Sequence, residues 1–387
     1  MNEIPIRLSA DRAPLWLSEP EGVPRSAQAD AARRGLAAYA RPAEGARVLD
    51  LFCGTGLGAL AAAQATPSAG VVACDANLRH CNLTAAHASR NGLTNVTVEH
   101  SDGFDHLGDA PFDAVYFYPP THIAGATVRK LIAQAFLRLR PGGRLWLVTH
   151  KRLGGQAYQG FAQGLFGAGR RPFRREGCEL ACYTRALDPD TGPAARLADE
   201  LAAEETHGFE LTLSGSTLRF VTKLNVFGWA GLDPGTGLLL DALPDLRPAR
   251  VLDLGCGYGP IGLVAARVYE GCALTMSDVD RRALDLARLN ADANGCAEAE
   301  VRASDGFDQL GRARYDLILS NLPTHIGKGR MQSLVRGAYD HLSPGGALVA
   351  VTGADLAVDR DAGAIFGKVA TVAQSPTHRV FRCDRTG

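Results

Sequence analysis

The chain carries one stretch of sequence twice, at a constant spacing of 203 residues. Val48–Gly56 reads VLDLFCGTG, and 203 residues later Val251–Gly259 reads VLDLGCGYG. Solenoid repeats run about 20–50 residues, so a spacing this long indicates a duplicated domain. The same offset, without a gap, pairs Asp75 with Asp278, Asn91-Gly92 with Asn294-Gly295, Ser101–Asp105 with Ser304–Asp308, Pro120–Ile123 with Pro323–Ile326, and Pro141–Gly143 with Pro344–Gly346.

The duplication divides the 387 residues into two domains, each long enough to bury its own core. Between them, Asp188–Pro193 is rich in turn residues and Ala194–Glu205 is rich in alanine and acids. We therefore expect an N-terminal domain over 1–187, a linker over 188–207 with a short exposed helix, and a C-terminal domain over 208–387. Phe209–Phe227 alternates apolar and polar residues, which predicts an antiparallel hairpin.

The composition is that of an ordinary globular protein, with 46% hydrophobic and 21% charged residues. No apolar run approaches the roughly 20 residues that span a bilayer, so we expect no membrane association. The first residues lack a signal-peptide pattern, and the nine cysteines are scattered rather than grouped as zinc ligands. We therefore expect no metal site and a location in the reducing cytoplasm. No feature indicates a dimer, and we expect a monomer.

Strand-like and helix-like segments alternate in each copy. This alternation predicts a fold of the α/β class, with two tandem Rossmann-like domains that each contain a mostly parallel twisted sheet flanked by helices. Ligands in such folds bind at the carboxyl ends of the strands. In the second copy we expect strands over 250–254, 273–277, 315–320 and 347–351, and helices over 262–268, 281–293 and 331–342.

A glycine-rich turn follows the first strand of each copy. Glycines at alternate positions let the backbone approach a ligand without a Cβ in the way. Asp278 ends the second strand about twenty residues later, where it could accept hydrogen bonds from a ribose. Taken alone this pattern also suits a dinucleotide site, because Gly255, Gly257, Gly259 and Gly262 loosely satisfy that spacing too.

The segments after the third and fourth strands separate the two interpretations. Asp305 ends the third strand, and Ser320–Thr324 (SNLPT) ends the fourth. With these residues the second copy resembles the class I S-adenosylmethionine-dependent methyltransferases. The resemblance implies S-adenosyl-L-methionine as the cofactor. It implies that Asp253 orients the glycine loop, that Asp278 binds the ribose and that Asp305 binds the adenine amine. Asn321 corresponds to the asparagine of the N-P-P motif. The implied cofactor-binding residues are Asp253, Gly255, Cys256, Gly257, Gly259, Asp278, Asp305 and Asn321.

The whole chain is similar to the tandem-domain ribosomal RNA guanine-N2 methyltransferases of the small-subunit type. Their N-P-P-F-H-x-G motif corresponds to Asn321–Gly327, and their entry segment looks like Asn225–Gly228 followed by Asp233–Leu240. The resemblance implies an inactive first domain and a second domain that methylates guanine N2 in ribosomal RNA, free or within a ribosomal subunit. The implied catalytic residues are Asn321, Pro323, Thr324 and His325.

The chemistry explains the asparagine. An exocyclic amine is a weak nucleophile, and an amide oxygen that accepts its hydrogen bond holds the lone pair towards the methyl sulfonium, so catalysis is mostly positioning and electrostatics. Two residues depart from the family motif: Leu322 replaces its first proline, and Thr324 replaces the aromatic residue that stacks on the target base. His325 is either a substitute stacking ring or a structural turn residue.

These departures leave two other functions open. One is methylation of adenine N6 or of a protein glutamine amide, since similar motifs serve both. The other is a non-catalytic protein that binds RNA or assists ribosome assembly. A nicotinamide dehydrogenase is disfavoured, because Asn321-Leu322-Pro323 has no role in one.

The first copy differs from the second at the catalytic position. It has Tyr118 in place of Asn321, and tyrosine offers no amide oxygen. Whether this copy still binds cofactor stays open, because the counterparts of the cofactor residues persist. They are Asp50, Gly54, Gly56, Asp75 and Asp102.

Charge is distributed unevenly although the net charge is zero. Between residues 114 and 187 there are twelve Arg or Lys residues and only Glu176 and Glu179 as acids. This region is either a solvated surface or a phosphate-binding face that docks RNA. The candidate RNA contacts are Arg129, Lys130, Lys151, Arg152, Arg170, Arg171, Arg174 and Arg175.

Overall fold

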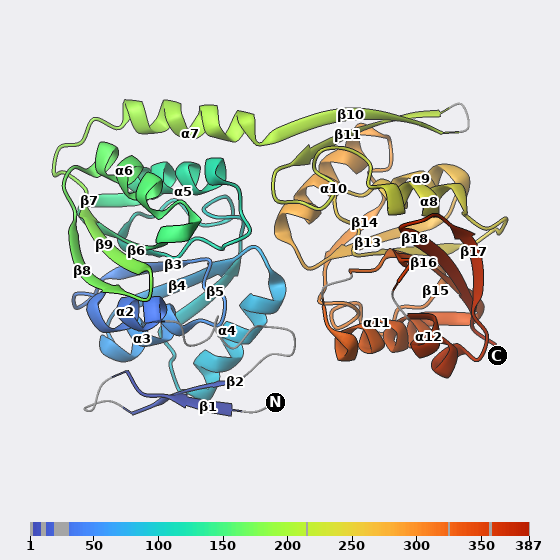
Figure 1. The fold of residues 1–387 in the computed structure, drawn as a ribbon, viewed down its shortest axis with the longest axis horizontal. Helices are drawn as coiled ribbons and strands as arrows, with labels where there is room; N and C mark the ends of the chain where they lie inside the picture. The colour runs from blue at the N-terminus through green and yellow to red at the C-terminus, as the bar shows by residue number, and fades with distance from the viewer. Residues whose placement is uncertain are drawn as a thin grey trace. The chain divides into compact units, whose positions relative to one another are not determined.

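The computed structural model describes residues 3–8, 13–18, 31–213, 216–323, 326–355 and 358–386. The chain forms two compact units, Met1–Glu205 and Thr206–Gly387. Each unit is built on a seven-stranded sheet with helices on both faces (Figure 1). The expected α/β fold with two mostly parallel sheets is therefore confirmed.

In the second unit the strands lie in the order β14-β13-β12-β15-β16-β18-β17. All pairs from β14 to β16 are parallel, and β18 runs antiparallel to both of its neighbours. The order reverses between β12 and β15, and ligands bind at such a switch point in open α/β sheets. The strands are β12 (Arg250–Leu254), β13 (Ala273–Asp278), β14 (Glu300–Ala303), β15 (Tyr315–Asn321), β16 (Leu342–Gly353), β17 (Ala370–Gln374) and β18 (His378–Asp384).

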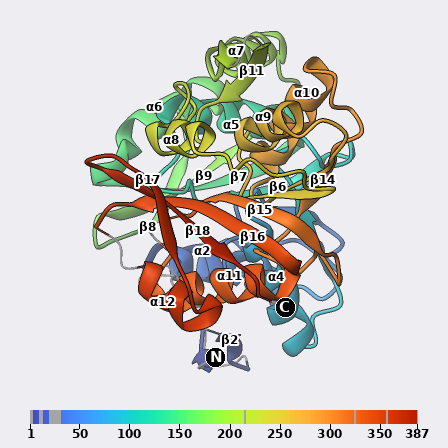
Figure 2. The same cartoon turned by 90° about the vertical axis from the view of Figure 1, so that its right-hand side faces the viewer.

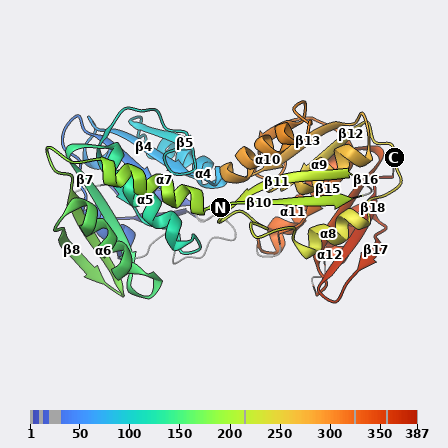
Figure 3. The same cartoon turned by 90° about the horizontal axis from the view of Figure 1, so that it is seen from above.

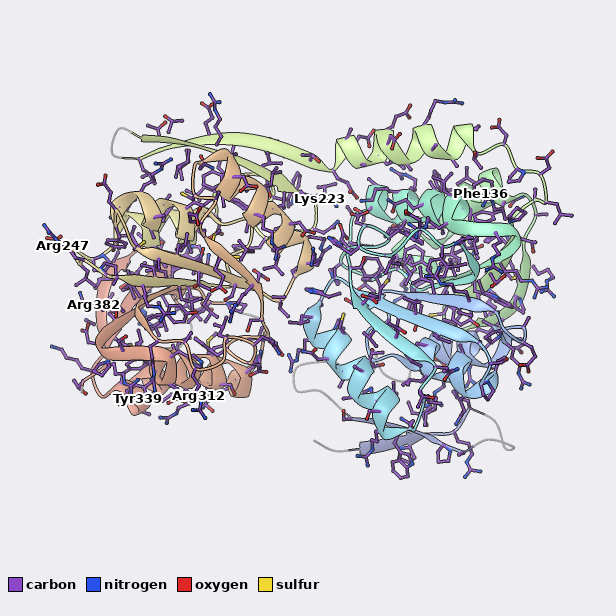
Figure 4. The ribbon with its side chains drawn as sticks, turned by 180° about the vertical axis from the view of Figure 1, so that it is seen from behind. Phe136, Lys223, Arg247, Arg312, Tyr339 and Arg382 are labelled. Atoms are coloured by element: carbon purple, nitrogen blue, oxygen red, sulfur yellow. The ribbon has the colours of Figure 1, made fainter. Side chains whose placement is uncertain are left out.

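Two layers of helices enclose this sheet (Figure 2). One face is covered by α8 (Pro234–Asp241), α9 (Pro260–Val268) and α10 (Arg281–Ala293). The other is covered by α11 (Lys328–His341) and α12 (Val358–Phe366). Tyr339 of α11, labelled in Figure 4, packs edge-on against Phe366 of α12, with ring centroids 5.1 Å apart.

The first unit repeats this architecture with the strand order β5-β4-β3-β6-β7-β9-β8. Its strands are β3 (Arg47–Leu51), β4 (Gly70–Asp75), β5 (Val96–His100), β6 (Phe112–Phe117), β7 (Leu139–His150), β8 (Arg170–Arg175) and β9 (Cys178–Thr184). Its helices are α2 (Ala31–Tyr39), α3 (Leu57–Ala65), α4 (Leu78–Arg90), α5 (Gly125–Arg138) and α6 (Gly155–Phe166), with a short 3-10 helix η1 at Lys151–Leu153.

An antiparallel hairpin accompanies each sheet: β1 (Glu3–Ile6) with β2 (Leu15–Ser18), and β10 (Thr206–Leu213) with β11 (Ser216–Lys223). Figure 3 looks down on the second hairpin. Phe209 and Phe220 of this hairpin pack against Tyr258 in the glycine-rich turn, with centroid distances of 5.9 and 5.8 Å. The hairpin expected near 209–227 is thus confirmed, and it supports the turn.

The segment expected to be a linker is largely a helix of the first unit. Helix α7 (Gly192–Glu204) buries Ala194, Ala198 and Leu201, and it lies beside α5 (Figure 3). At its end, Glu205 accepts a hydrogen bond from Lys130 Nζ at 2.5 Å, and both side chains are almost completely buried. An apolar face and a buried ion pair therefore hold the helix on the first unit.

Most elements predicted for the second copy are confirmed. Strand β12 and helix α10 have the expected bounds, and the other predicted strands and helices differ by a few residues at their ends. Strand β16 is longer than expected, because it includes the Ser343–Gly346 turn, where its register with β15 shifts. Across the described residues, no helix combines the length and the apolar character needed to cross a bilayer.

Candidate active site at the carboxyl edge of the second sheet

Three glycines in the turn after β12 adopt left-handed backbone conformations. Gly255, Gly257 and Gly259 have φ angles of 72°, 57° and 93°, which residues with a Cβ rarely adopt. A Cβ added to Gly255 or Gly257 would meet no atom within 4 Å. The space in front of the turn is therefore open to a ligand that lies against bare backbone.

Asp253 lies beneath this turn and is fully buried. Its Oδ2 accepts a hydrogen bond from the backbone N–H of Gly262 at 2.7 Å, which ties the end of β12 to α9. Burial raises the pKa of this carboxyl group to about 7, although the Gly262 N–H acts in the opposite direction. The neighbouring Cys256 is also buried, and burial raises the pKa of its thiol well above the usual value. Both residues support the turn from within.

Asp278 ends β13 and contacts the turn from the side. Its Oδ2 accepts a hydrogen bond from Gly257 N at 2.9 Å, and its Oδ1 accepts one from Asp280 N at 2.9 Å. Burial, followed by the charge of Asp280, raises the pKa of Asp278 to about 6. Asp278 as a whole is half-buried, so it is accessible in part to hydroxyl groups of a ligand.

Asp305 follows β14 and forms an ion pair with Arg330 of α11. Its backbone N–H donates to Gln309 Oε1 at 2.7 Å, which closes the loop locally. Sequence reasoning did not identify Arg330. The only signal for Arg330 in the sequence is its position in the first turn of the helix after the N-P-P-like loop. Local sequence does not show that Asp305 is its partner.

Asn321 is the last residue of β15, across the switch point from Asp253. Its Nδ2 donates to Asp233 Oδ2 at 2.9 Å and to Thr236 Oγ1 at 3.0 Å. Asp233 is the N-cap residue of α8 and accepts a second hydrogen bond, from Thr236 N at 2.9 Å. Neither Asp233 nor Thr236 was expected in the site, although an Asp-Pro pair before a helical run is a capping signal.

The structure explains one departure from the family motif. The backbone N–H of Leu322 donates to Val351 O at 3.0 Å, and its side chain is buried in the core beneath α11 and α12. A proline there would lose both the donor and part of the apolar packing. Pro323 follows and is exposed, whereas the proposed site residues Thr324 and His325 lie outside the described residues.

Two exposed aromatic side chains lie on the loop that leads from β11 into this site. Phe227 is 66% exposed and Trp229 is 45% exposed, which is unusual for rings of this size. The loop rests on the glycine-rich turn, since Tyr258 Oη donates to Gly231 O at 3.4 Å. Two residues later it reaches Asp233, the partner of Asn321. The loop that carries the aromatic pair thus contacts the glycine turn through Gly231 and Asn321 through Asp233.

The first unit has aromatic residues where the second unit has an open turn. Phe52 stands at the position of Gly255 and keeps a left-handed φ of 59° despite its side chain. It is buried, and its ring lies 6.2 Å from that of Phe117. The next residue, Tyr118, occupies the position of Asn321. The phenyl group of Phe52 therefore occupies space next to the turn, where the second unit has only backbone.

Asp75, the counterpart of Asp278, already has an imidazole beside it. His80 Nδ1 lies 3.2 Å from Asp75 Oδ2, and Gly54 N donates to the same carboxylate at 3.0 Å. Burial alone would raise the pKa of Asp75, but the imidazole of His80 and nearby N–H groups lower it overall. The histidine has no counterpart in the second unit, where the equivalent position is Ala283.

Most of the residues expected to form the basic face are exposed. Lys130 is an incorrect member, because it is buried and paired with Glu205. Arg129 is half-buried. Some charge is neutralised, since Arg171 and Arg174 pair with Glu179 at 2.7 and 3.8 Å and Arg175 pairs with Glu176 at 3.2 Å. The remaining members are exposed, and they are Lys151, Arg152, Arg170, Arg171, Arg174 and Arg175.

Four of these arginines lie on β8, the edge strand of the first sheet. The segment reads RRPFRR, whereas β17, its counterpart in the second unit, reads ATVAQ. Lys151 of η1 lies beside the β8–β9 turn, since its N–H donates to Gly177 O at 2.8 Å. We call Lys151, Arg152, Arg174 and Arg175 the basic hairpin edge. Of these two edge strands, β8 carries the basic charge and β17 does not.

Comparison with known proteins gives a consistent result. The model of the methyltransferase small domain family matches twice, over residues 15–171 and 217–382. The chain is 32% identical to the ribosomal RNA small subunit methyltransferase C of Pseudomonas entomophila, over 72% of this chain and 80% of that protein. It is 31% identical to that of Shewanella amazonensis, over 78% of this chain and 88% of that protein.

A solved structure has the same overall fold. It is the 16S rRNA N2 methyltransferase RsmC of T. thermophilus, in complex with AdoMet and guanosine. The TM-score is 0.79, the identity is 24%, and the match covers 99% of this chain and 98% of the other.

Proposed function

Because this chain belongs to the methyltransferase small domain family, together with the ribosomal RNA small subunit methyltransferase C proteins, we propose that it methylates N2 of a guanine in small-subunit ribosomal RNA. The methyl donor is S-adenosyl-L-methionine. The observation that carries the proposal is the orientation of Asn321, whose amide N–H groups are both engaged by Asp233 and Thr236. Its oxygen is therefore directed away from these partners and is available to an amine.

The residues of the second unit fit this cofactor. The glycine turn has open space in front of Gly255 and Gly257, and the half-buried Asp278 lies beside it. The carboxylate of Asp278 can accept hydrogen bonds from the ribose hydroxyls. The carboxylate of Asp305 can accept one from the adenine amine when Arg330 releases one of the two Asp305 oxygens. When bound, the cofactor supplies an electrophilic methyl group on a cationic sulfur.

The protein contributes position and electrostatics rather than a covalent intermediate. The oxygen of Asn321 accepts an N–H of the guanine amine and holds its lone pair towards the methyl group. As positive charge develops on the amine nitrogen, the amide dipole stabilises it.

We infer that the target base stacks on Phe227 and Trp229. A base must leave its helix to reach an active site of this kind. Stacking on an aromatic side chain contributes about 1–3 kcal/mol per base, and Thr324 cannot provide it. The exposed pair lies on the loop between β11 and α8, which contacts the glycine turn through Gly231 and Asn321 through Asp233.

The first unit, in this proposal, binds RNA and not cofactor. Phe52 occupies the space next to its turn, and His80 pairs with its ribose-type carboxylate. The basic hairpin edge supplies phosphate contacts, which the second unit lacks at the equivalent strand. The chain works as a monomer in this scheme, because one polypeptide carries both functions. Its nine cysteines are free thiols, in keeping with the reducing cytoplasm.

Methylation of 16S ribosomal RNA and of isolated small subunits tests the proposal, with nucleoside mass analysis of the product. We expect N2-methylguanosine from the wild-type protein and none from Asn321→Ala, which should still bind one equivalent of cofactor by calorimetry. Tyr118→Phe, at the equivalent position of the first unit, is the control and should be fully active. Wild-type turnover by Asn321→Ala, or N6-methyladenosine as the product, would contradict the proposal.

A further inference from the structure

Asp233 makes a contact with Asn321 that fixes the orientation of its side-chain amide. The two residues are 88 positions apart, and the carboxylate Oδ2 lies 2.9 Å from the amide. A carboxylate can only accept hydrogen bonds, so the amide atom that faces it must be the nitrogen. The amide oxygen is therefore directed to the opposite side.

The carboxylate is held in a rigid setting. Asp233 caps α8, and Leu239 and Leu240 bury that helix in the core of the second unit. The start of the helix is packed closely against β18, because a Cβ on Gly235 would lie 2.8 Å from the ring of His378. A functional group carried by a capped and tightly packed helix end keeps its geometry during a reaction.

We propose that Asp233 is a positioning residue for methyl transfer and that its negative charge acts on the reaction through the Asn321 amide. The inference rests on the proposed function. In the reaction the carbon–sulfur bond of the methyl group breaks as its bond to the amine nitrogen forms. The sulfur keeps the bonding electron pair and becomes neutral, while the nitrogen becomes positive until it releases one proton to water.

The charge of Asp233 favours this redistribution. A hydrogen bond from an amide N–H to a carboxylate increases the negative charge on the amide oxygen, because linked hydrogen bonds polarise one another. The oxygen of Asn321 then accepts more strongly from the amine as positive charge develops there. The interaction is stronger in the transition state than with the neutral amine, so it raises kcat rather than lowering KM.

Two substitutions separate charge from orientation. Asp233→Asn retains a side-chain oxygen that can accept from both Thr236 N and Asn321 Nδ2, and asparagine is an equally good N-cap. It therefore preserves α8 and the amide orientation but removes the negative charge. Asp233→Ala removes both. Thr236→Val removes the second acceptor and leaves the charge in place. Asp241→Asn, at the exposed far end of the same helix, is the matched control.

Steady-state methylation kinetics test the inference, with cofactor affinity and circular dichroism measured on each variant. We expect Asp233→Asn to lower kcat about tenfold, which corresponds to about 1.4 kcal/mol of transition-state stabilisation, with KM for RNA and cofactor affinity unchanged. Asp233→Ala should lower kcat further, Thr236→Val should lower it less than Asp233→Asn does, and Asp241→Asn should match the wild type.

The possible outcomes separate the inference from the proposed function. If the wild-type protein methylates RNA and Asp233→Asn retains its kcat, the inference is wrong and the proposed function stands. If the wild-type protein methylates no ribosomal RNA, the proposed function fails first. A loss in Asp233→Asn that appears only in KM or in folding would also overturn the inference.

Discussion

The side-chain amide of Asn294 holds the backbone of Arg219 as a neighbouring β-strand would. Its Oδ1 accepts from Arg219 N at 2.9 Å, and its Nδ2 donates to Arg219 O at 2.8 Å. In the first unit Asn91 makes the same pair with Trp16, at 2.8 and 2.9 Å. The offset is again 203 residues, so the duplicated unit includes the hairpin that precedes each sheet.

A second asparagine of α10 holds the same hairpin in the same way, and this contact predicts an effect on the stability of the second unit. Asn290, one helical turn before Asn294, is fully buried and binds Val221 N and O at 2.8 and 2.9 Å. Asn290→Ala leaves these backbone groups without their partner and should lower the free energy of unfolding by about 1–3 kcal/mol. Urea denaturation followed by circular dichroism measures the change. Leu289→Ala, an exposed neighbour on α10, should shift stability by less than about 0.5 kcal/mol, and equal losses in the two variants would contradict this prediction.

The pKa of Asp253 predicts how stability varies with pH. Its folded-state pKa of about 7 lies above the value of about 3.9 for an unfolded aspartate. The folded unit therefore binds this proton more tightly, and the resulting stabilisation is complete below pH about 4 and is lost as the pH rises towards about 7. Unfolding free energies measured from pH 4 to 8 should fall more steeply for the wild type than for Asp253→Asn. Parallel curves for the two proteins would show that the carboxyl group does not titrate in this range.

The exposed aromatic pair predicts a selective loss of RNA binding. Trp229→Ala and Phe227→Ala should each raise KM for RNA about five- to 150-fold, as expected from the loss of about 1–3 kcal/mol of base stacking. Cofactor affinity should not change, because the glycine turn and Asp278 remain intact. The control is Trp16→Ala, which removes a similarly exposed tryptophan from the first unit. Unchanged KM in both site variants would exclude stacking at these positions.

The basic hairpin edge predicts a change in salt dependence. Replacement of Arg174 and Arg175 by glutamine should weaken RNA binding, and the slope of log K against log salt should decrease by about 0.7–0.9 for each phosphate that the protein no longer neutralises. The measurement is a series of binding titrations over a range of salt concentrations. Arg247→Gln, an exposed arginine of the second unit labelled in Figure 4, should leave the slope unchanged. An unaltered slope in the double variant would place the RNA elsewhere.

Local pattern was sufficient to predict the sheet and many of its elements. Strand β12 is a short run of β-branched and aliphatic residues before glycines, and α10 begins at a capping Asp280 and ends at Asn294-Gly295. Both signals act over a few residues, so sequence reasoning located these boundaries. The motif residues Asp253, Asp278 and Asn321 could be placed at one edge because parallel strands end on the same side of a sheet.

Contacts between distant segments could not be predicted in this way. The partner of Asn321 is 88 residues earlier, and nothing in the sequence near Asp233 indicates that the two side chains meet. Lys130 was expected on an exposed basic face, because a run of basic residues does not reveal that Glu205 of another segment covers one of them. Thr324 and His325 remain predictions.

Phe52 has a consequence for the evolutionary history of the duplication. The phenyl group of Phe52 contributes to the core of the first unit, so glycine at this position would leave a cavity, although it would relieve the left-handed backbone conformation. After that single change His80 would still pair with Asp75, the counterpart of Asp278. Tyr118 would still stand at the position of Asn321. Recovery of the first site requires several changes. Packing at Phe52 would thus oppose a reversal of the proposed division of labour between the two copies.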